Sequence, residues 1–118
     1  SGMVHVRGGT EAEVLFGQGW AMASLRLWQM EFFKRLGAGR LAEALGPDAA
    51  DPDVLFRTLD FHGRSLRDLE ALEATEDGRR VLEGLQHFCR GVNAYVQEMG
   101  SRRLPLEFWL LGVEPTRC

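Results

Sequence analysis

Residues 14–36 are apolar on nearly every side of the helix that their spacing predicts. Small or apolar residues fall on two neighbouring stripes at helical spacing. The first stripe holds Val14, Gly17, Ala21, Leu25, Trp28, Phe32 and Leu36, and the second holds Phe16, Trp20, Ala23, Leu27 and Met30. A helix of this kind is normally buried all round. Because a chain of 118 residues has little sequence left to surround it, we expect a partner to cover part of this helix.

The rest of the sequence predicts a mainly α-helical unit that fills residues 1–118 as one domain. Alternating residues at 3–7 predict a short N-terminal strand, and about five helices are expected to follow. These helices are expected at about 10–35, 40–45, 53–74, 76–99 and 105–111, with a break in the third near His62 and Gly63. No repeat or low-complexity tract interrupts the pattern.

Several expected helix ends carry capping residues. Thr10 and Glu13 have the spacing of a capping box, in which a hydroxyl and a carboxylate satisfy backbone N–H groups at the helix start. Asp51 followed by Pro52 predicts an N-cap and a first-turn proline. Gly100 is the expected C-terminal cap of the helix before it.

Charge and hydropathy argue against two classes of function. The net charge is −3 and the basic residues are spread along the chain, which disfavours nucleic-acid binding. No apolar run approaches the roughly 18 residues that a membrane span needs, so we expect no membrane-spanning segment. The first residues do not resemble a signal peptide, but a segment removed upstream would leave no trace, so the location stays open.

The two cysteines, Cys89 and Cys118, leave two interpretations open. Two cysteines are too few for a disulfide scaffold, and no Cys-x-x-Cys spacing is present for zinc or redox chemistry. We favour two ordinary thiols over a bridge between them.

No residue of this chain is predicted to be catalytic, to bind a cofactor or to hold a metal. His5, His62 and His87 each lack a second candidate ligand on a shared helix face. The carboxylates fall mostly in first turns or on solvated faces, where the helix dipole and solubility explain them. Gly8 and Gly9 lack the other residues of a phosphate-binding loop.

Three stretches of the sequence carry distinctive motifs: 2–6 (GMVHV), 16–31 (FGQGWAMASLRLWQME) with 39–46 (GRLAEALG), and 91–95 (GVNAY) with 104–108 (LPLEF) and 112–115 (GVEP). They resemble signatures of the penicillin acylase family of N-terminal-nucleophile hydrolases. They occur in the family's order and spacing, so the resemblance covers almost the whole chain. The most specific block is Arg-Leu-Trp-Gln-Met-Glu, followed by Gly-Val-Asn-Ala-Tyr.

The sequence departs from the family pattern at two positions. Val4 stands where the family usually has proline, which frees φ and restores a backbone N–H. Leu25 replaces the aspartate that usually precedes Arg26, so we expect the interaction between that aspartate and the arginine to be missing.

The resemblance implies that this chain is the front part of a helical α subunit. Such a subunit comes from a precursor that cleaves itself, removes a spacer and exposes a serine as the first residue of a separate β subunit. The complete enzyme is then expected to have the four-layer αββα fold of N-terminal-nucleophile hydrolases. The resemblance also implies a periplasmic or secreted enzyme with a structural calcium. The family's α-subunit residues for the acyl pocket and the calcium lie beyond the segment matched by Glu114 and Pro115.

The activity implied is hydrolysis of the amide in a small N-acyl substrate, of the β-lactam or N-acyl-homoserine-lactone type. In this interpretation the long helix packs on the β subunit. Gly17 and Gly19 then allow close backbone approach, and Trp20 and Trp28 fill the seam. The alternative is a non-catalytic helical interaction module or a degenerate acylase relative.

Ser1 is the residue type that this enzyme class uses as its nucleophile. The family's β subunit, however, opens on serine followed by asparagine, whereas Gly2 follows here. Ser1 also directly precedes the opening segment of the α subunit. We therefore interpret Ser1 as an arbitrary start of the sequence, and no catalytic residue is assigned to the chain.

Overall fold

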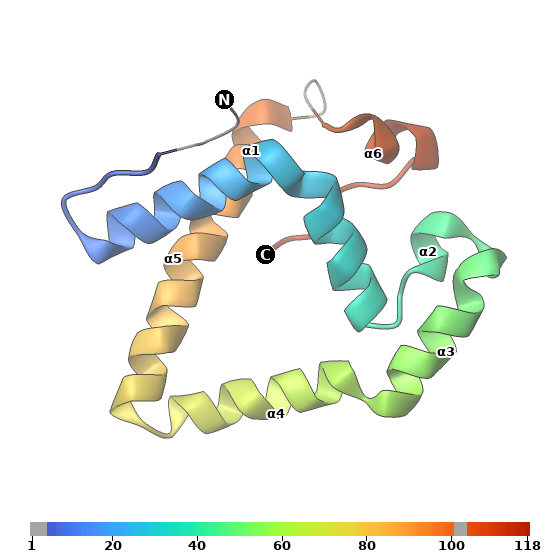
Figure 1. Ribbon diagram of the computed structural model, residues 1–118, viewed down its shortest axis with the longest axis horizontal. Helices are drawn as coiled ribbons and strands as arrows, with labels where there is room; N and C mark the ends of the chain where they lie inside the picture. The colour runs from blue at the N-terminus through green and yellow to red at the C-terminus, as the bar shows by residue number, and fades with distance from the viewer. Residues whose placement is uncertain (1–4, 101–103) are drawn as a thin grey trace.

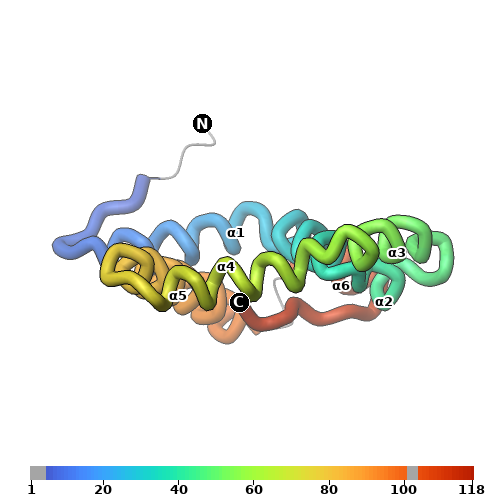
Figure 2. The backbone as a smooth tube through the Cα atoms, turned by 90° about the horizontal axis from the view of Figure 1, so that it is seen from below, coloured from blue at the N-terminus to red at the C-terminus, as the bar shows by residue number. Residues whose placement is uncertain are grey.

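The computed structural model describes residues 5–100 and 104–118, and its helices form a flat, open frame (Figure 1). The elements are α1 (Glu11–Gly37), α2 (Ala42–Leu45), the 3-10 helix η1 (Pro47–Ala49), α3 (Ala50–Leu59), α4 (Phe61–Glu73), α5 (Glu76–Met99) and α6 (Leu106–Leu111). Helices α1, α3, α4 and α5 make the sides of the frame, and Figure 2 shows the frame edge-on as a thin layer. The extents are 47 × 39 × 25 Å. The predicted mainly α-helical fold is therefore confirmed for this chain.

The expected N-terminal strand is wrong over the residues that can be judged. His5, Val6 and Arg7 form no strand, and Met3 and Val4 lie outside the described residues. A strand needs a neighbour to satisfy its backbone groups, and the described part of the chain offers no second strand.

Threonines cap the starts of the two longest helices, and the cap of α1 is the predicted one. Thr10 Oγ1 accepts a hydrogen bond from the N–H of Glu13 at 3.2 Å, and the Glu13 carboxylate accepts one from the N–H of Gly9 at 2.7 Å. A capping box is thus present, but the Glu13 carboxylate binds the N–H of Gly9 and not the expected N–H of Thr10. Thr75 caps α5 in the same way, and Gly100 ends α5 with φ +57°.

The prediction for the start of α3 is wrong. Helix α3 begins at Ala50, and Asp51 lies exposed within its first turn instead of capping it. The 3-10 helix η1 leads directly into α3, so no extended N-cap residue is needed. The break between α3 and α4 falls at Asp60, which has φ +56°, two residues before the predicted position.

Helix α1 is kinked at Arg26, whose φ of −141° and ψ of 28° are not helical. Just before the kink, the Ser24 hydroxyl donates to the carbonyl of Ala21 at 2.7 Å. A hydroxyl that bonds back to the preceding turn competes with the helical ladder and bends helices. Arg26 and Ser24 both lie in segment 16–31, which carries the most specific block of the family resemblance, so the kink falls within that segment.

The buried face of α1 is narrower than the two predicted stripes. Its buried residues are Gly19, Ala23, Leu27 and Glu31, which follow one another at intervals of four. Leu25, from the first stripe, is 57% exposed. Only one edge of the predicted apolar surface is therefore packed within this chain.

Helices α1 and α5 cross at two buried glycines. A Cβ on Gly19 would overlap the carbonyl of Phe88, and a Cβ on Gly91 would overlap the carbonyl of Phe16. The two backbones touch at this crossing, which only residues without a side chain permit. The close approach expected at Gly19 therefore takes place within the chain, with α5, and not with a second subunit.

A small core lies beside this crossing. Ala23, Leu27, Val92 and Phe108 are its buried members. The predicted seam aromatics pack here within the chain: Trp20 meets Tyr95 edge-on at 5.3 Å between ring centroids, and Trp28 meets Phe108 at 5.2 Å. Trp20, Trp28 and Met30 all stay half-buried, so their own chain encloses none of them fully.

Cys89 of α5 and Cys118 form a disulfide, with 5.1 Å between their Cα atoms. Our preference for two ordinary thiols is therefore wrong. The two cysteines are 29 positions apart. They meet because the chain returns to α5 after α6, a long-range contact that no local spacing reveals.

Candidate functional site

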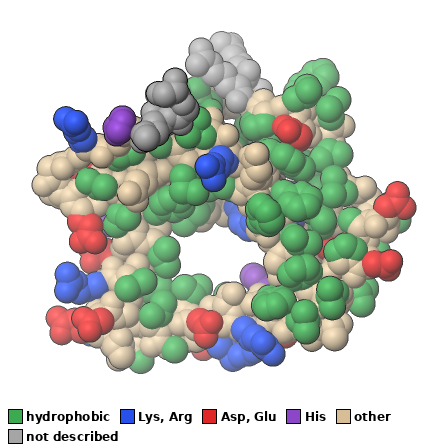
Figure 3. All heavy atoms as spheres, viewed as in Figure 1, with side chains coloured by type: hydrophobic (Ala, Val, Ile, Leu, Met, Phe, Trp, Pro, Cys, Tyr) green, Lys and Arg blue, Asp and Glu red, His purple; other side chains and the backbone are tan. Residues whose placement is uncertain are grey.

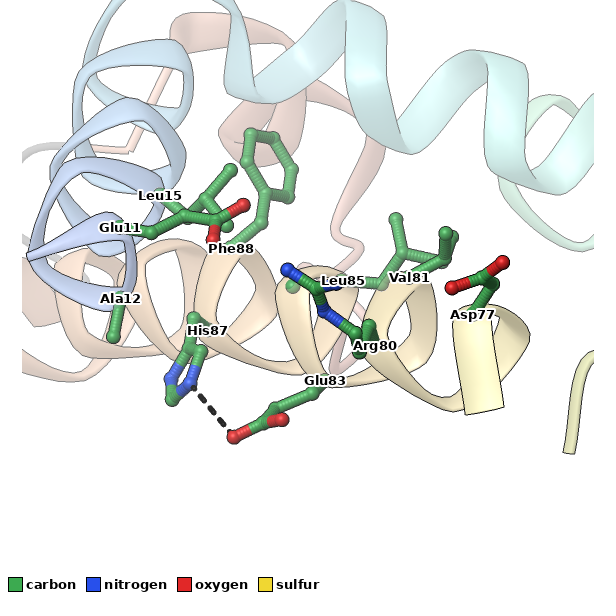
Figure 4. A pocket seen from close by; sticks show the side chains of 11 residues that line it. Glu11, Ala12, Leu15, Asp77, Arg80, Val81, Glu83, Leu85, His87 and Phe88 are labelled. Atoms are coloured by element: carbon green, nitrogen blue, oxygen red, sulfur yellow. Dashed lines mark ion pairs between the residues drawn. The ribbon is translucent and has the colours of Figure 1, made fainter. Parts of the chain in front are cut away.

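A groove lies in the angle between the start of α1 and the first half of α5. It has a volume of about 630 Å³. Its lining residues are Glu11, Ala12, Leu15, Asp77, Arg80, Val81, Glu83, Gly84, Leu85, His87 and Phe88 (Figure 4). Leu15, Val81, Leu85 and Phe88 give it an apolar wall, and charged side chains border that wall.

This groove has the chemistry of an apolar contact surface with a charged border. Its lining includes no serine, threonine, cysteine or lysine that could act as a nucleophile. His87 lies 3.9 Å from Glu83 and 3.2 Å from an Arg90 nitrogen. Figure 4 shows His87 and Glu83 on the side of α5 away from Leu15 and Phe88, so this pair points out of the apolar part of the groove.

A smaller hollow of about 380 Å³ lies at the kink of α1. Ser24, Trp28, Tyr95 and Glu107 are among its lining residues. Arg26 at the kink is exposed and makes no ion pair within residues 5–100 and 104–118.

The three histidines are not brought together. His5 and His62 are exposed on different parts of the frame, and His87 is half-buried on α5. Among the described residues, no group of three or more His, Cys, Asp or Glu side chains is arranged to hold a metal ion. Ser1 lies outside the described residues.

Two carboxylates, Glu31 and Asp53, are buried, whereas the sequence pattern placed most carboxylates in first turns or on solvated faces. Glu31 is 2% exposed, and it accepts hydrogen bonds from Arg35 Nε at 2.8 Å and from the backbone and hydroxyl of Thr116 at 3.0 Å each. Asp53 is also buried, and it accepts from the N–H groups of Leu41 at 2.7 Å and Ala42 at 2.8 Å. Asp53 thus caps the start of α2 from α3.

The sequence does carry a signal for Glu31. It falls four residues after Leu27, on the same row as Gly19 and Ala23, which is the row that packs against α5. Asp53 has no comparable signal, because its partners lie on another element.

Arg40 and Glu43 form an exposed ion pair near α2, with Nη2 and Oε2 at 2.9 Å. The side-chain hydrogen bond from Arg40 holds the pKa of the Glu43 carboxyl below its ordinary value, and the same bond raises the pKa of Arg40. Because both side chains are about half exposed, the pair contributes little to stability.

Large apolar side chains cover much of the exposed surface. Val81 and Leu85 of α5, Leu66 and Leu69 of α4, and Phe33 of α1 are among those at least 40% exposed. Trp109 and Leu110 of α6 are 80% and 69% exposed. Figure 3 shows an opening through the middle of the frame, with apolar side chains along its rim.

The chain is also more expanded than a self-contained domain of its size. Its accessible surface is 8607 Å², whereas a compact monomer of 13.2 kDa would have about 6,400 Å². Its radius of gyration is 16.0 Å, against about 13.5 Å for a compact domain of this length. These features define an open helical frame that exposes an extensive apolar surface.

Comparison with known proteins agrees with this class. The family model for penicillin amidase matches residues 1–117. Penicillin acylase 2 proenzyme of Pseudomonas sp. (strain SE83) is 38% identical over 97% of the chain, and acyl-homoserine lactone acylase QuiP of Pseudomonas aeruginosa is 33% identical over 97%. Penicillin G acylase of Escherichia coli is 29% identical over 98% of the chain. The chain belongs to the penicillin amidase family.

The match covers only a small part of each relative. The chain spans 14% of the penicillin acylase 2 proenzyme and of penicillin G acylase, and 13% of QuiP. None of the described helices is long and apolar enough to cross a membrane.

Proposed function

We propose that this chain is the front part of the α subunit of a heterodimeric amidohydrolase that is cut from a longer precursor. The proposal rests above all on one observation: nearly the whole chain matches acylases that are about seven times longer. One of these relatives carries the word proenzyme in its name.

The exposed apolar surface supports a large partner. The chain exposes roughly 2,200 Å² more surface than a compact domain of its mass. Permanent subunit interfaces commonly bury 2,000 Å² or more and are rich in apolar side chains. We assign this surface to the β subunit of the same precursor, which would cover α4, α6 and the first half of α5.

The reaction we propose is hydrolysis of the amide bond in a small N-acyl compound. The first residue of the β subunit, a serine, attacks the amide carbonyl, and its own α-amine acts through a water molecule as the base. Backbone donors in the β subunit stabilise the developing oxyanion. The amine leaves, and water then releases the acid from the acyl-enzyme. The chain described here serves as the scaffold on which this centre is held.

The substrate class follows from the named relatives. They are penicillin acylases and acyl-homoserine lactone acylases, so the amine released is proposed to be a β-lactam nucleus or a homoserine lactone. The structural calcium is proposed to lie elsewhere in the complete enzyme, because the described residues provide no suitable cluster of ligands. No step of the reaction is assigned to it.

Expression of the complete reading frame tests the proposal. Mass spectrometry should find two chains, the second beginning with serine, and amine should be released from benzylpenicillin-type or N-acyl-homoserine-lactone substrates. Substitution of that serine by alanine should abolish both processing and amine release. An uncleaved chain without activity towards the whole panel would instead support a non-catalytic helical module or a degenerate relative.

A further inference from the structure

The last residues of the chain lie across the two long helices. We name residues 113–118 the strap; they follow α6 and have no regular secondary structure. The C-terminus lies within the angle between α1 and α5 in Figure 1. The strap is attached to both helices, and the Cys89–Cys118 disulfide is one of its attachments.

The strap is bound to α5 by a second attachment one turn away from the disulfide. Asn93 Nδ2 donates to the carbonyl of Cys118 at 3.1 Å, and the N–H of Cys118 donates to Asn93 Oδ1 at 2.9 Å. Asn93 stands four positions after Cys89, so the two side chains share a helix face. This amide holds the backbone of Cys118 where its sulfur can reach Cys89.

The strap is bound to α1 through Thr116. The Glu31 carboxylate accepts hydrogen bonds from both the N–H and the hydroxyl of Thr116. Lys34 Nζ donates a hydrogen bond to the backbone carbonyl of Thr116 at 2.9 Å. Thr116 thereby helps to cover a carboxylate that is only 2% exposed. Val113 adds an apolar contact to the core beside Phe108.

The crossing of α1 and α5 does not depend on the strap. The helices touch at Gly19 and Gly91, and the crossing is formed by their own backbones. Cys118 is exposed and Cys89 is half-buried, so an external thiolate can reach the bond from the side of Cys118. Opening the bond would therefore release the strap and leave the helix pair in place.

We propose that the Cys89–Cys118 disulfide is a redox-operated clasp that locks the strap across α1 and α5. In exchange with a small-molecule disulfide such as oxidised glutathione, the two thiols lose two protons and two electrons and form the S–S bond. The S–S bond of the oxidant breaks and becomes two thiols. In an oxidising compartment the clasp is closed, and in a reducing one the strap is free to leave Glu31 and Asn93. This inference does not depend on the proposed function.

The test uses the full-length protein that contains this chain, equilibrated in buffers of graded glutathione ratio. Free thiols are trapped by alkylation, and the peptides of Cys89 and Cys118 are mapped by mass spectrometry. Both cysteines should change together in one two-electron transition. Hydrogen exchange should become faster at Thr116 and Cys118 on reduction, while the amides around Gly19 and Gly91 keep their protection.

A matched pair of variants tests the positioning role of Asn93. Asn93→Ala should lower the equilibrium constant for closing the clasp by about tenfold, the size expected for the loss of two exposed hydrogen bonds. Gln97→Ala, on the exposed surface one turn further along α5, should leave the constant unchanged. The proposal is overturned if the two cysteines stay reduced at every ratio, if either one pairs elsewhere, if reduction leaves exchange in the strap unchanged, or if both variants give the same constant.

Discussion

At the scale of single residues, backbone contact and buried charge determine the geometry of this chain. Gly19 and Gly91 let two helices touch, and Glu31 and Asp53 supply acceptors to backbone groups that would otherwise lack partners. Their effects are therefore expected in folding and assembly first, and in activity only as a consequence.

Gly19→Ala should separate α1 from α5. The added methyl group would overlap the carbonyl of Phe88, and relief of that overlap is expected to cost about 2–3 kcal/mol. Gly37→Ala is the control, because a Cβ there meets nothing within 4 Å, and it should be neutral or stabilising by up to about 1 kcal/mol. Native-state hydrogen exchange of α1 and α5 in the complete protein measures the change in opening free energy that each variant causes. Equal opening free energies in the two variants would contradict the backbone contact.

Asp53→Ala should destabilise the corner formed by α2, η1 and α3. It removes a buried acceptor from the N–H groups of Leu41 and Ala42, at a cost of about 2–3 kcal/mol. Asp51→Ala, at an exposed position two residues earlier, should change stability by less than about 0.5 kcal/mol. Thermal unfolding of the two variants, compared with the parent protein, distinguishes them. A larger effect at Asp51 would restore it as the helix cap.

At the scale of elements, the helices differ in how much of their surface this chain covers. Helix α1 buries one row of residues, whereas α4 has no buried residue at all. The second half of α5 packs on the core, while Val81 and Leu85 in its first half stay exposed. The uncovered elements are the ones that we assign to the partner subunit.

Trp109→Ser on α6 should separate folding from assembly. Its side chain is 80% exposed, so the substitution should change the stability of this chain by no more than about 0.5 kcal/mol. If the partner covers α6, loss of an aromatic anchor should cost about 2 kcal/mol or more of association and lower the yield of two-chain enzyme. Glu107→Ser, exposed on the same helix, is the control for size-exclusion analysis of the assembled protein. Normal assembly of Trp109→Ser would place the interface elsewhere.

At the scale of the whole molecule, the frame is more open than a compact domain of the same length. Its exposed apolar side chains lie on α1, α3, α4, α5 and α6, and a central opening passes through it (Figure 3). Apolar patches of this extent normally mark a surface that another polypeptide covers. The penicillin amidase relatives, which are far longer than this chain, are consistent with that interpretation.

Expression of residues 1–118 alone should yield a chain that binds a hydrophobic fluorescent dye and self-associates. The complete protein should bind little dye, because the same surface is then covered. Dye fluorescence and light scattering at matched concentrations measure the difference. A monomer with dispersed side-chain NMR signals and no dye binding would show that the chain needs no covering partner.

Local sequence patterns predicted much of the secondary structure of this chain. Caps and periodicity depend on neighbouring residues, so the sequence predicted both ends of α5 and the start of α1. The family was predicted separately, from the resemblance of three sequence stretches to its signatures, and the family match confirms it. Tertiary structure alone decided which helix crosses α1 at Gly19, the hydrogen-bond partners of Glu31 and Asp53 on other elements, and the disulfide. Each of these depends on groups brought together from distant positions. A pattern read along one segment contains no information about such partners.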